Sequence, residues 1–211
     1  MPPESRISAI VEYEIRDKKG KLIKKGKVKG RTWTKNFARF IRILFGETGD
    51  DSPNQPVERG GTYVSVSTSD LGTATVKALE GSDFYGIVVG KGGTPPTKED
   101  STDVYRLADQ FYHGDEDNKL HYYDTLVENV SVSDSNILVT VKRDFKNNGS
   151  VDVSIGEIGL GIKLTIGGSD YYFFIYVSQF TSPVSVPAGA TITWFIRLKH
   201  GYLASETPSS A

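Results

Sequence analysis

The chain has 211 residues, a net charge of −1 and no cysteine, which excludes a disulfide framework, a thiol nucleophile and a cysteine zinc site. No apolar run approaches the roughly 18 residues of a membrane span, and the first residues lack the apolar segment of a secretory signal. With 37% hydrophobic and 24% charged residues, the composition predicts a soluble globular protein, one domain with an appendage.

The charges are divided unevenly along the chain. Residues 1–46 hold 13 Lys and Arg against 4 Asp and Glu, whereas residues 47–124 hold 15 acids and 6 bases. Such a division can attract nucleic acid, or it can attract the basic arm of one subunit to the acidic body of the next. The plainer interpretation is a lysine-rich hairpin that is simply solvated.

The first predicted elements are two strands joined by a tight turn. From residue 7 to residue 15 the odd positions are apolar and most even positions are polar, which predicts a strand with one buried face. Residues 17–20 (DKKG) are a turn signal, and a lysine-dense strand returns over 22–28. Because lysine side chains discourage unwanted strand pairing, we expect this second strand at the edge of a sheet.

One amphipathic helix is predicted over 34–45. Its apolar residues recur at the spacing of one helical face, and its basic residues lie on other faces. We expect the apolar stripe to pack on a sheet, while the basic residues are solvated or touch phosphate. The stripe consists of Phe37, Phe40, Ile41 and Leu44, and the basic residues are Lys35, Arg39 and Arg42.

The middle of the chain predicts short elements. Residues 46–61 are mostly turn formers and acids, which indicates a loop. Short strands are predicted at 62–66, 73–79 and 84–89, and a brief helix is predicted within 101–108.

The second half predicts longer strands, at 121–133, 137–145, 151–166, 171–177 and 191–199. In the third of these the apolar positions are odd up to Ile155 and even from Ile158. A strand cannot change the parity of its buried face without an extra residue, so we expect a β-bulge at Gly156 and Glu157. Residues 171–177 (YYFFIYV) are apolar or aromatic on both faces, which predicts a central strand covered on both sides or a strand whose second face meets another subunit.

These elements together predict a mainly β protein. Many short strands with Gly and Pro turns favour an antiparallel β-sandwich or jelly roll with one N-terminal amphipathic helix. The expected segments are a basic N-terminal hairpin or arm over 1–31, the helix over 32–46, a sandwich body over 47–204 and a flexible tail over 205–211.

Motifs for catalysis, cofactors and metals are incomplete. The glycine-rich stretch 86–92 has three residues between its first two glycines instead of four, and no hydroxyl residue follows the lysine, so it does not match a phosphate loop. The three histidines lack zinc-site spacing, and the acidic turn that starts at Asp115 lacks the glycine and the distal glutamate of a calcium loop. An enzyme whose residues meet only in the fold ranks last. We expect no enzyme, no cofactor, and no catalytic or metal-binding residue.

Three stretches carry a resemblance. They are YEIRDKKGKLIK at 13–24 leading to RTWTKNF at 31–37, IVVGKGGTPPT at 87–97, and FKNNGSVDVSIGEIGL at 145–160 followed by SPVSVPAGATITW at 182–194. In this order they resemble virion structural proteins of tailed phages and of viruses infecting thermophilic archaea and bacteria. The resemblance implies a capsid, decoration, spike or tail subunit, located in the virion, that assembles with copies of itself and with other virion proteins and has no chemistry of its own.

Two further functions stay open. The basic arm and helix could contact nucleic acid or neighbouring subunits. The residues for such contacts are Lys24, Lys25, Lys27, Lys29, Arg39 and Arg42. The other alternative is a carbohydrate-binding or receptor-binding β-sandwich module. Its exposed aromatic platform would consist of Phe111, Tyr112, Tyr122 and Tyr123.

Overall fold

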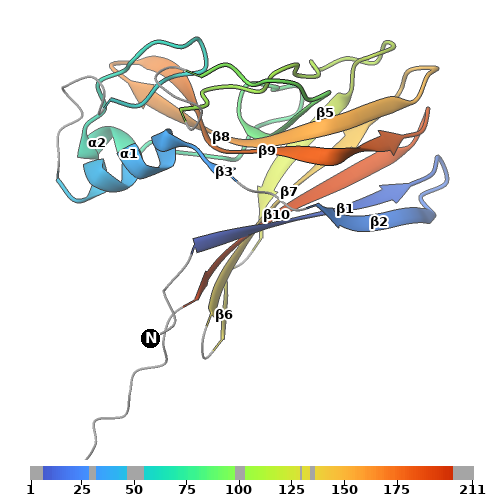
Figure 1. The fold of residues 1–211 in the computed structure, drawn as a ribbon, viewed down its shortest axis with the longest axis horizontal. Coiled ribbons are helices and arrows are strands. Elements are labelled where there is room, and N and C mark those ends of the chain that lie inside the picture. Colours follow the sequence, from blue (N-terminus) through green and yellow to red (C-terminus); the bar gives the residue numbers. More distant parts are fainter. Residues whose placement is uncertain are drawn as a thin grey trace, which may run out of the picture.

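The chain was analysed as a computed structural model. The structure describes residues 7–28, 32–46, 55–97, 103–128, 130–133 and 136–201. Over these ranges the protein is mainly β, with two antiparallel sheets and two short helices (Figure 1). No helix in the described part of the chain is long and apolar enough to cross a membrane.

The first sheet, sheet A, has the strand order β2-β1-β10-β7-β5, and β6 pairs with β7 as well. Its strands are β1 (Ile7–Arg16), β2 (Leu22–Val28), β5 (His121–Val127), β6 (Ser131–Ser133), β7 (Asn136–Lys146) and β10 (Thr191–Gly201). The lysine-rich strand β2 lies at the edge, as predicted. Strand β1 is paired on both sides, with β2 and β10, so the described part of the predicted arm is built into the sheet.

The second sheet, sheet B, has the order β3-β9-β8-β4. Its strands are β3 (Thr32–Trp33), β4 (Gly86–Gly90), β8 (Val153–Ile166) and β9 (Ser169–Val186). Across both sheets the pairing is nested, because β1 pairs with β10, β3 with β9, β4 with β8 and β5 with β7. The two outer pairings of this series therefore join strands from opposite ends of the chain.

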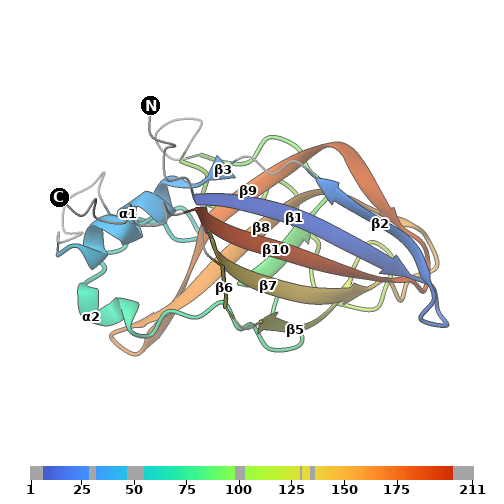
Figure 2. The same cartoon turned by 90° about the horizontal axis from the view of Figure 1, so that it is seen from below.

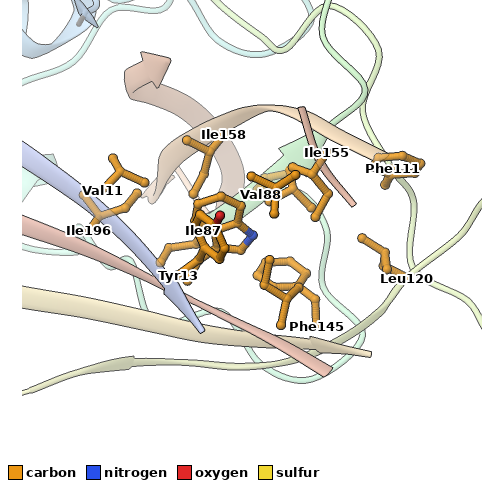
Figure 3. Packing of buried hydrophobic residues seen from close by; sticks show 14 of the residues in the cluster. Val11, Tyr13, Ile87, Val88, Phe111, Leu120, Phe145, Ile155, Ile158 and Ile196 are labelled. Carbon is orange, nitrogen blue, oxygen red and sulfur yellow. The ribbon is translucent and has the colours of Figure 1, made fainter. Parts of the chain in front are cut away.

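One apolar core lies between the two sheets (Figure 3). Sheet A contributes Val11, Tyr13 and Ile15 from β1, which confirms the predicted odd-numbered buried face. The fully buried Trp194 of β10 lies beside Tyr13, with ring centroids 5.2 Å apart. Sheet B supplies Ile87 and other apolar side chains from the opposite side. The face-to-face packing gives the molecule a sandwich-like form.

The aromatic strand β9 is covered on both faces, as predicted. Phe174 belongs to the core between the sheets, whereas Phe173 packs on the other face against Phe40 of helix α1 (Lys35–Leu44), with ring centroids 5.3 Å apart. Helix α1 and the short helix α2 (Thr68–Leu71) lie together at one end of the molecule (Figures 1 and 2).

Helix α1 lies within the range expected for a helix, but of the predicted apolar stripe only Phe40 is fully buried. The buried residues are Asn36, Arg39, Phe40 and Ile43, whereas Ile41 and Leu44 are exposed. The helix is turned because its buried polar side chains have partners elsewhere. The Asn36 amide donates to the Val57 carbonyl oxygen (2.7 Å) and accepts from the Val57 N–H (2.8 Å).

The middle of the chain differs most from the prediction. Of the three short strands expected between 62 and 89, only the last corresponds to a strand, β4; Tyr63 and Thr75 form isolated bridges. The helix expected within 101–108 is absent from its described residues, 103–108, where Val104 instead bridges to Thr97. These segments run along the sheet edges, and contacts with the edge strands hold them in place.

The pairing of β8 with β9 shifts register between Ile155 and Glu157, where the bulge was expected, but the extra residues, 180–183, belong to β9 and not to β8. Glycine is required there, because a Cβ at position 156 would collide with the backbone oxygen of Lys91.

We expect Gly156→Ala to lower the free energy of unfolding by about 1–3 kcal/mol, measured by urea unfolding. The exposed neighbour Ser154 supplies the control Ser154→Ala, with an expected change within about 0.5 kcal/mol. Equal effects of both substitutions would contradict this account.

Candidate interaction surface beside strand β2

Three hollows in the surface meet at strand β2. Two of them, of about 420 Å³ and 310 Å³, lie on the outer face of sheet A, and the third, of about 550 Å³, lies between β2 and β9. Lys27 lines all three, while Glu12 and Arg197 line the first two. The surface around β2 is therefore indented on both of its sides.

Strand pairing explains why these charged groups meet. Glu12 lies opposite Lys27 of β2 on one side and opposite Phe195 of β10 on the other. Its carboxylate pairs with Lys27 (Nζ to Oε1, 2.7 Å) and with Arg197 (Nε to Oε2, 3.0 Å). The hydrogen bond from Lys27 lowers the pKa of Glu12, and the charge of Arg197 adds to this effect against partial burial. One acid thus holds two cations on the outer face.

The third hollow, here called the β2–β9 groove, has a different lining. It is formed by Tyr13, Lys24, Lys27 and Val28 together with residues 179–184 of β9. Two lysines and no acid belong to this described lining. Because Lys27 is paired with Glu12 on the outer face, the positive charge of the groove comes chiefly from Lys24. Lys24 Nζ lies 5.9 Å from the centroid of the Tyr13 ring.

An excursion of β9 forms one wall of the β2–β9 groove. Glu157 of β8 pairs with Gln179 and Ile155 pairs with Val184, so residues 180–183 of β9 lie opposite Gly156 alone. Within this excursion Phe180 packs on Trp194, with ring centroids 5.3 Å apart. The excursion therefore covers the core with an aromatic ring and leaves polar residues at the groove.

The basic residues suggested by the sequence are divided by the structure. Lys24, Lys25 and Lys27 lie exposed on β2, and Lys29 lies outside the described residues. Arg42 is exposed on α1, which lies toward the opposite end of the molecule from β2 (Figures 1 and 2).

Arg39 does not belong to a basic surface. Its guanidinium is buried and pairs with both carboxylate oxygens of Asp103, at 2.7 and 3.0 Å. A phosphate in solution cannot reach this group without breaking the pair. The expectation that Arg39 contacts nucleic acid was therefore wrong. Within the described residues, the basic residues of the arm and of helix α1 do not form one basic face.

Sequence reasoning missed Arg197 and the β9 excursion. The position of Arg197 could have been predicted, because Ile196 and Leu198 were placed on the inner face of β10, which puts Arg197 on the outer face. The excursion left no such signal. The bulge at Gly156 indicates extra length in β8, whereas the structure adds its extra residues to β9.

The predicted aromatic platform does not form. Phe111 and Tyr122 are buried in the core, and the Tyr122 hydroxyl donates to the carbonyl oxygen of Phe111 at 2.6 Å. Tyr112 is exposed and Tyr123 is half-buried. A sugar stacked on Tyr122 would have to enter the core, so this platform was wrong.

Two other charged sites serve the fold. Glu157, buried at the bulge, accepts hydrogen bonds from the backbone N–H groups of Ala108 (3.0 Å) and Asp109 (2.9 Å), and burial raises its pKa. His121 lies between Asp115 (Nδ1 to Oδ1, 3.0 Å) and Glu80 (Nε2 to Oε1, 2.7 Å). No group of three metal-ligating side chains occurs within the ranges described.

The comparisons with known proteins leave the description at the level of the fold. No protein-family model, curated protein or solved structure matches the chain. The structure itself defines a mainly β protein with two antiparallel sheets around one core. Its candidate site is a set of grooves beside a basic edge strand, with ion pairs on the outer face.

Proposed function

We propose that the chain is a virus structural protein, a capsid, decoration, spike or tail subunit of a virion that assembles with copies of itself and with other virion proteins without catalysis. The resemblance of three stretches of the sequence to virion proteins of phages and of viruses of thermophilic hosts supports this proposal. The mainly β architecture, with a sandwich-like core, suits a rigid repeated subunit.

The exposure of apolar side chains at two separate places carries the proposal. At the end of α1, Leu44 and Phe45 are 58% and 86% exposed, and around β6, Val130 and Val132 are 56% and 66% exposed. Figure 1 shows β6 projecting away from the body, far from α1. Exposed apolar patches mark interaction sites. Two different patches on one chain suit head-to-tail contacts, which close into rings or extend as filaments.

The finer fold is proposed to be a β-sandwich with the nested strand pairing of a jelly roll. The nested pairing of β1 with β10, β3 with β9, β4 with β8 and β5 with β7 supports this assignment, with β2 and β6 as additional edge strands. In a regular jelly roll the successive pairs alternate between the two sheets. Here β4·β8 and β3·β9 both lie in sheet B, so the assignment is to a variant of that fold.

The test is the mass of the purified chain by light scattering, with negative-stain microscopy for rings, lattices or tubes. We expect assembly that grows with concentration and weakens in Phe45→Ser and in Val132→Ser, because each removes exposed apolar area from one of the two patches. Leu79→Ser is the matched control, since Leu79 is equally exposed, at 71%, and lies outside both patches. A chain that stays monomeric at its highest soluble concentration would contradict the proposal.

A further inference from the structure

Most edges of the two sheets are covered by short segments of the same chain. At the β5 edge, the Thr125 N–H donates to the Ala78 oxygen (2.8 Å) and the Gly81 N–H donates to the Tyr122 oxygen (2.9 Å). At the β4 edge, the Phe111 N–H donates to the Val89 oxygen (3.0 Å). These edges have used their backbone hydrogen bonds and cannot add another strand there.

The first half of β9 is covered in the same way. It pairs with β3 at Tyr176 and Val177, and its Tyr172 oxygen accepts from the Arg59 N–H at 2.8 Å. Within the described residues, β2 pairs only with β1, and β9 beyond Ser178 pairs only with β8. These two uncovered edges lie on one side of the molecule, which we call the open side, where β2 and β9 flank the β2–β9 groove (Figure 2).

The charge of the open side restricts what can pair there. Strand β2 carries Lys24, Lys25 and Lys27 and no acid. Pairing of β2 with the β2 of a second copy would place lysines opposite lysines, and like charges across two strands are destabilising. Lysines on an edge discourage unwanted pairing in general, but an acidic strand would meet them as cross-strand partners of opposite charge.

We propose that the open side binds an extended, acidic segment of a partner protein, which adds as a strand beside β2. Unpaired backbone groups of β2 provide the hydrogen bonds of strand addition, and the side chains that flank the groove provide selectivity. Lys24 pairs with a carboxylate of the segment, and Lys27, which Glu12 already pairs on the outer face, adds to the positive field. Tyr13 and Val28 contact the apolar groups of the segment. This site goes beyond the proposed assembly function, because it requires neither exposed apolar patch.

The test uses a labelled peptide of seven residues, the length of β2, that alternates Thr and Glu. A second peptide replaces Glu with Lys, and a third keeps Glu but carries N-methyl groups on alternate amides, which removes backbone donors at unchanged charge. Fluorescence anisotropy measures binding, and amide chemical shifts of the isotope-labelled chain locate it. We expect the acidic peptide to bind, with shifts confined to β2 and residues 178–184, and the other two peptides to bind at least about tenfold more weakly.

The variant pair Lys24→Glu with Lys27→Glu reverses the charge of the groove and is expected to weaken binding of the acidic peptide about tenfold or more. The matched control is Lys142→Glu with Lys199→Glu, which makes the same charge change on the outer face of sheet A, away from the groove lining. Circular dichroism checks that both variants fold.

Five results would overturn the proposal, four of them from the peptide experiments and one from the chain alone. The first four are absence of binding at millimolar acidic peptide, equal binding of the N-methylated peptide, equal loss in the control variant, and competition by duplex DNA with the same shifts. Shifts at the same amides on raising the concentration of the chain alone would assign the open side to a second copy and would also overturn it. Each result is separate from the mass measurement above, because Phe45→Ser and Val132→Ser leave the groove intact.

Discussion

Replacing Arg143 with Met is expected to lower the free energy of unfolding by about 3–5 kcal/mol. Arg143 on β7 is 1% exposed, and its guanidinium donates only to backbone carbonyl oxygens. The acceptors and distances are Tyr123 (2.6 Å), Ser82 (2.6 Å), Ile87 (2.9 Å), Tyr85 (3.2 Å) and Leu79 (3.3 Å).

The loss arises because Arg143 fixes a segment that has little regular structure of its own. Residues 79–87 run along the edge of the sheets, and four of the five acceptors belong to them. Met fills much of the volume but leaves these carbonyl groups buried without donors. Burial lowers the pKa of Arg143 to about 10, which still leaves the group charged at neutral pH, and its guanidinium lies 4.8 Å from the Tyr122 ring centroid.

A graded series tests this role by urea unfolding. Arg143→Lys keeps the charge but has three donors instead of five, so its loss should fall between that of Arg143→Met and zero. Lys142→Met is the control, because the neighbouring Lys142 is partly exposed and pairs with Glu128 at 3.2 Å; its expected change is within about 1 kcal/mol. If Arg143→Met and Lys142→Met lose the same amount, the carbonyl cluster does not depend on the guanidinium.

The second large effect is expected at the buried pair of Arg39 and Asp103. Asp103→Ala should cost about 3–5 kcal/mol, because it leaves the Arg39 guanidinium buried without its carboxylate. The side chains of Arg39 and Asp103 are only 6% and 1% exposed, so water cannot replace the lost partner. The pair links α1 to Asp103, which follows Arg39 by 64 residues in the sequence.

The combined variant Arg39→Met with Asp103→Leu distinguishes the effect of losing the ion pair from the effect of leaving one charge buried and unpaired. Replacing both partners with apolar groups removes the unpaired charge, so the combined variant should be more stable than Asp103→Ala alone. Glu14→Ala is the control, since its pair with Arg16 is partly exposed on both sides, and its expected change is within about 1 kcal/mol. Thermal and urea unfolding give the comparison, and a combined variant no more stable than Asp103→Ala would refute this explanation.

The strands of the second half could be predicted from sequence because the pattern of apolar and polar residues in each strand indicates which of its faces are buried. The apolar parity of β8 changes at Gly156, and that change located the register shift, although not the strand that carries the extra residues. The YYFFIYV stretch of β9 has no polar face, and the structure covers both of its faces, with Phe173 and Phe174 in different clusters. Period-2 patterns carry this information because successive side chains point to opposite faces.

The face of α1 and the segments between 62 and 108 could not be predicted in this way. Asn36 and Arg39 are buried because of partners at Val57 and Asp103, and a helical period cannot show partners that are distant in sequence. The same limit applies to the candidate site. The lysines of β2 and their edge position followed from the sequence, whereas the groove depends on an excursion of β9 that pairs against a single glycine.

The nested order of strand pairing also governs the time course of folding. Ile7 at the start of β1 lies opposite His200 near the end of β10, so sheet A closes only after nearly the whole chain is available. Contacts between residues so distant in sequence slow folding, because the loop must close before the contact stabilises anything. During synthesis on the ribosome, the apolar side of β1 therefore stays exposed in the β1–β2 hairpin until strand β10 has left the exit tunnel.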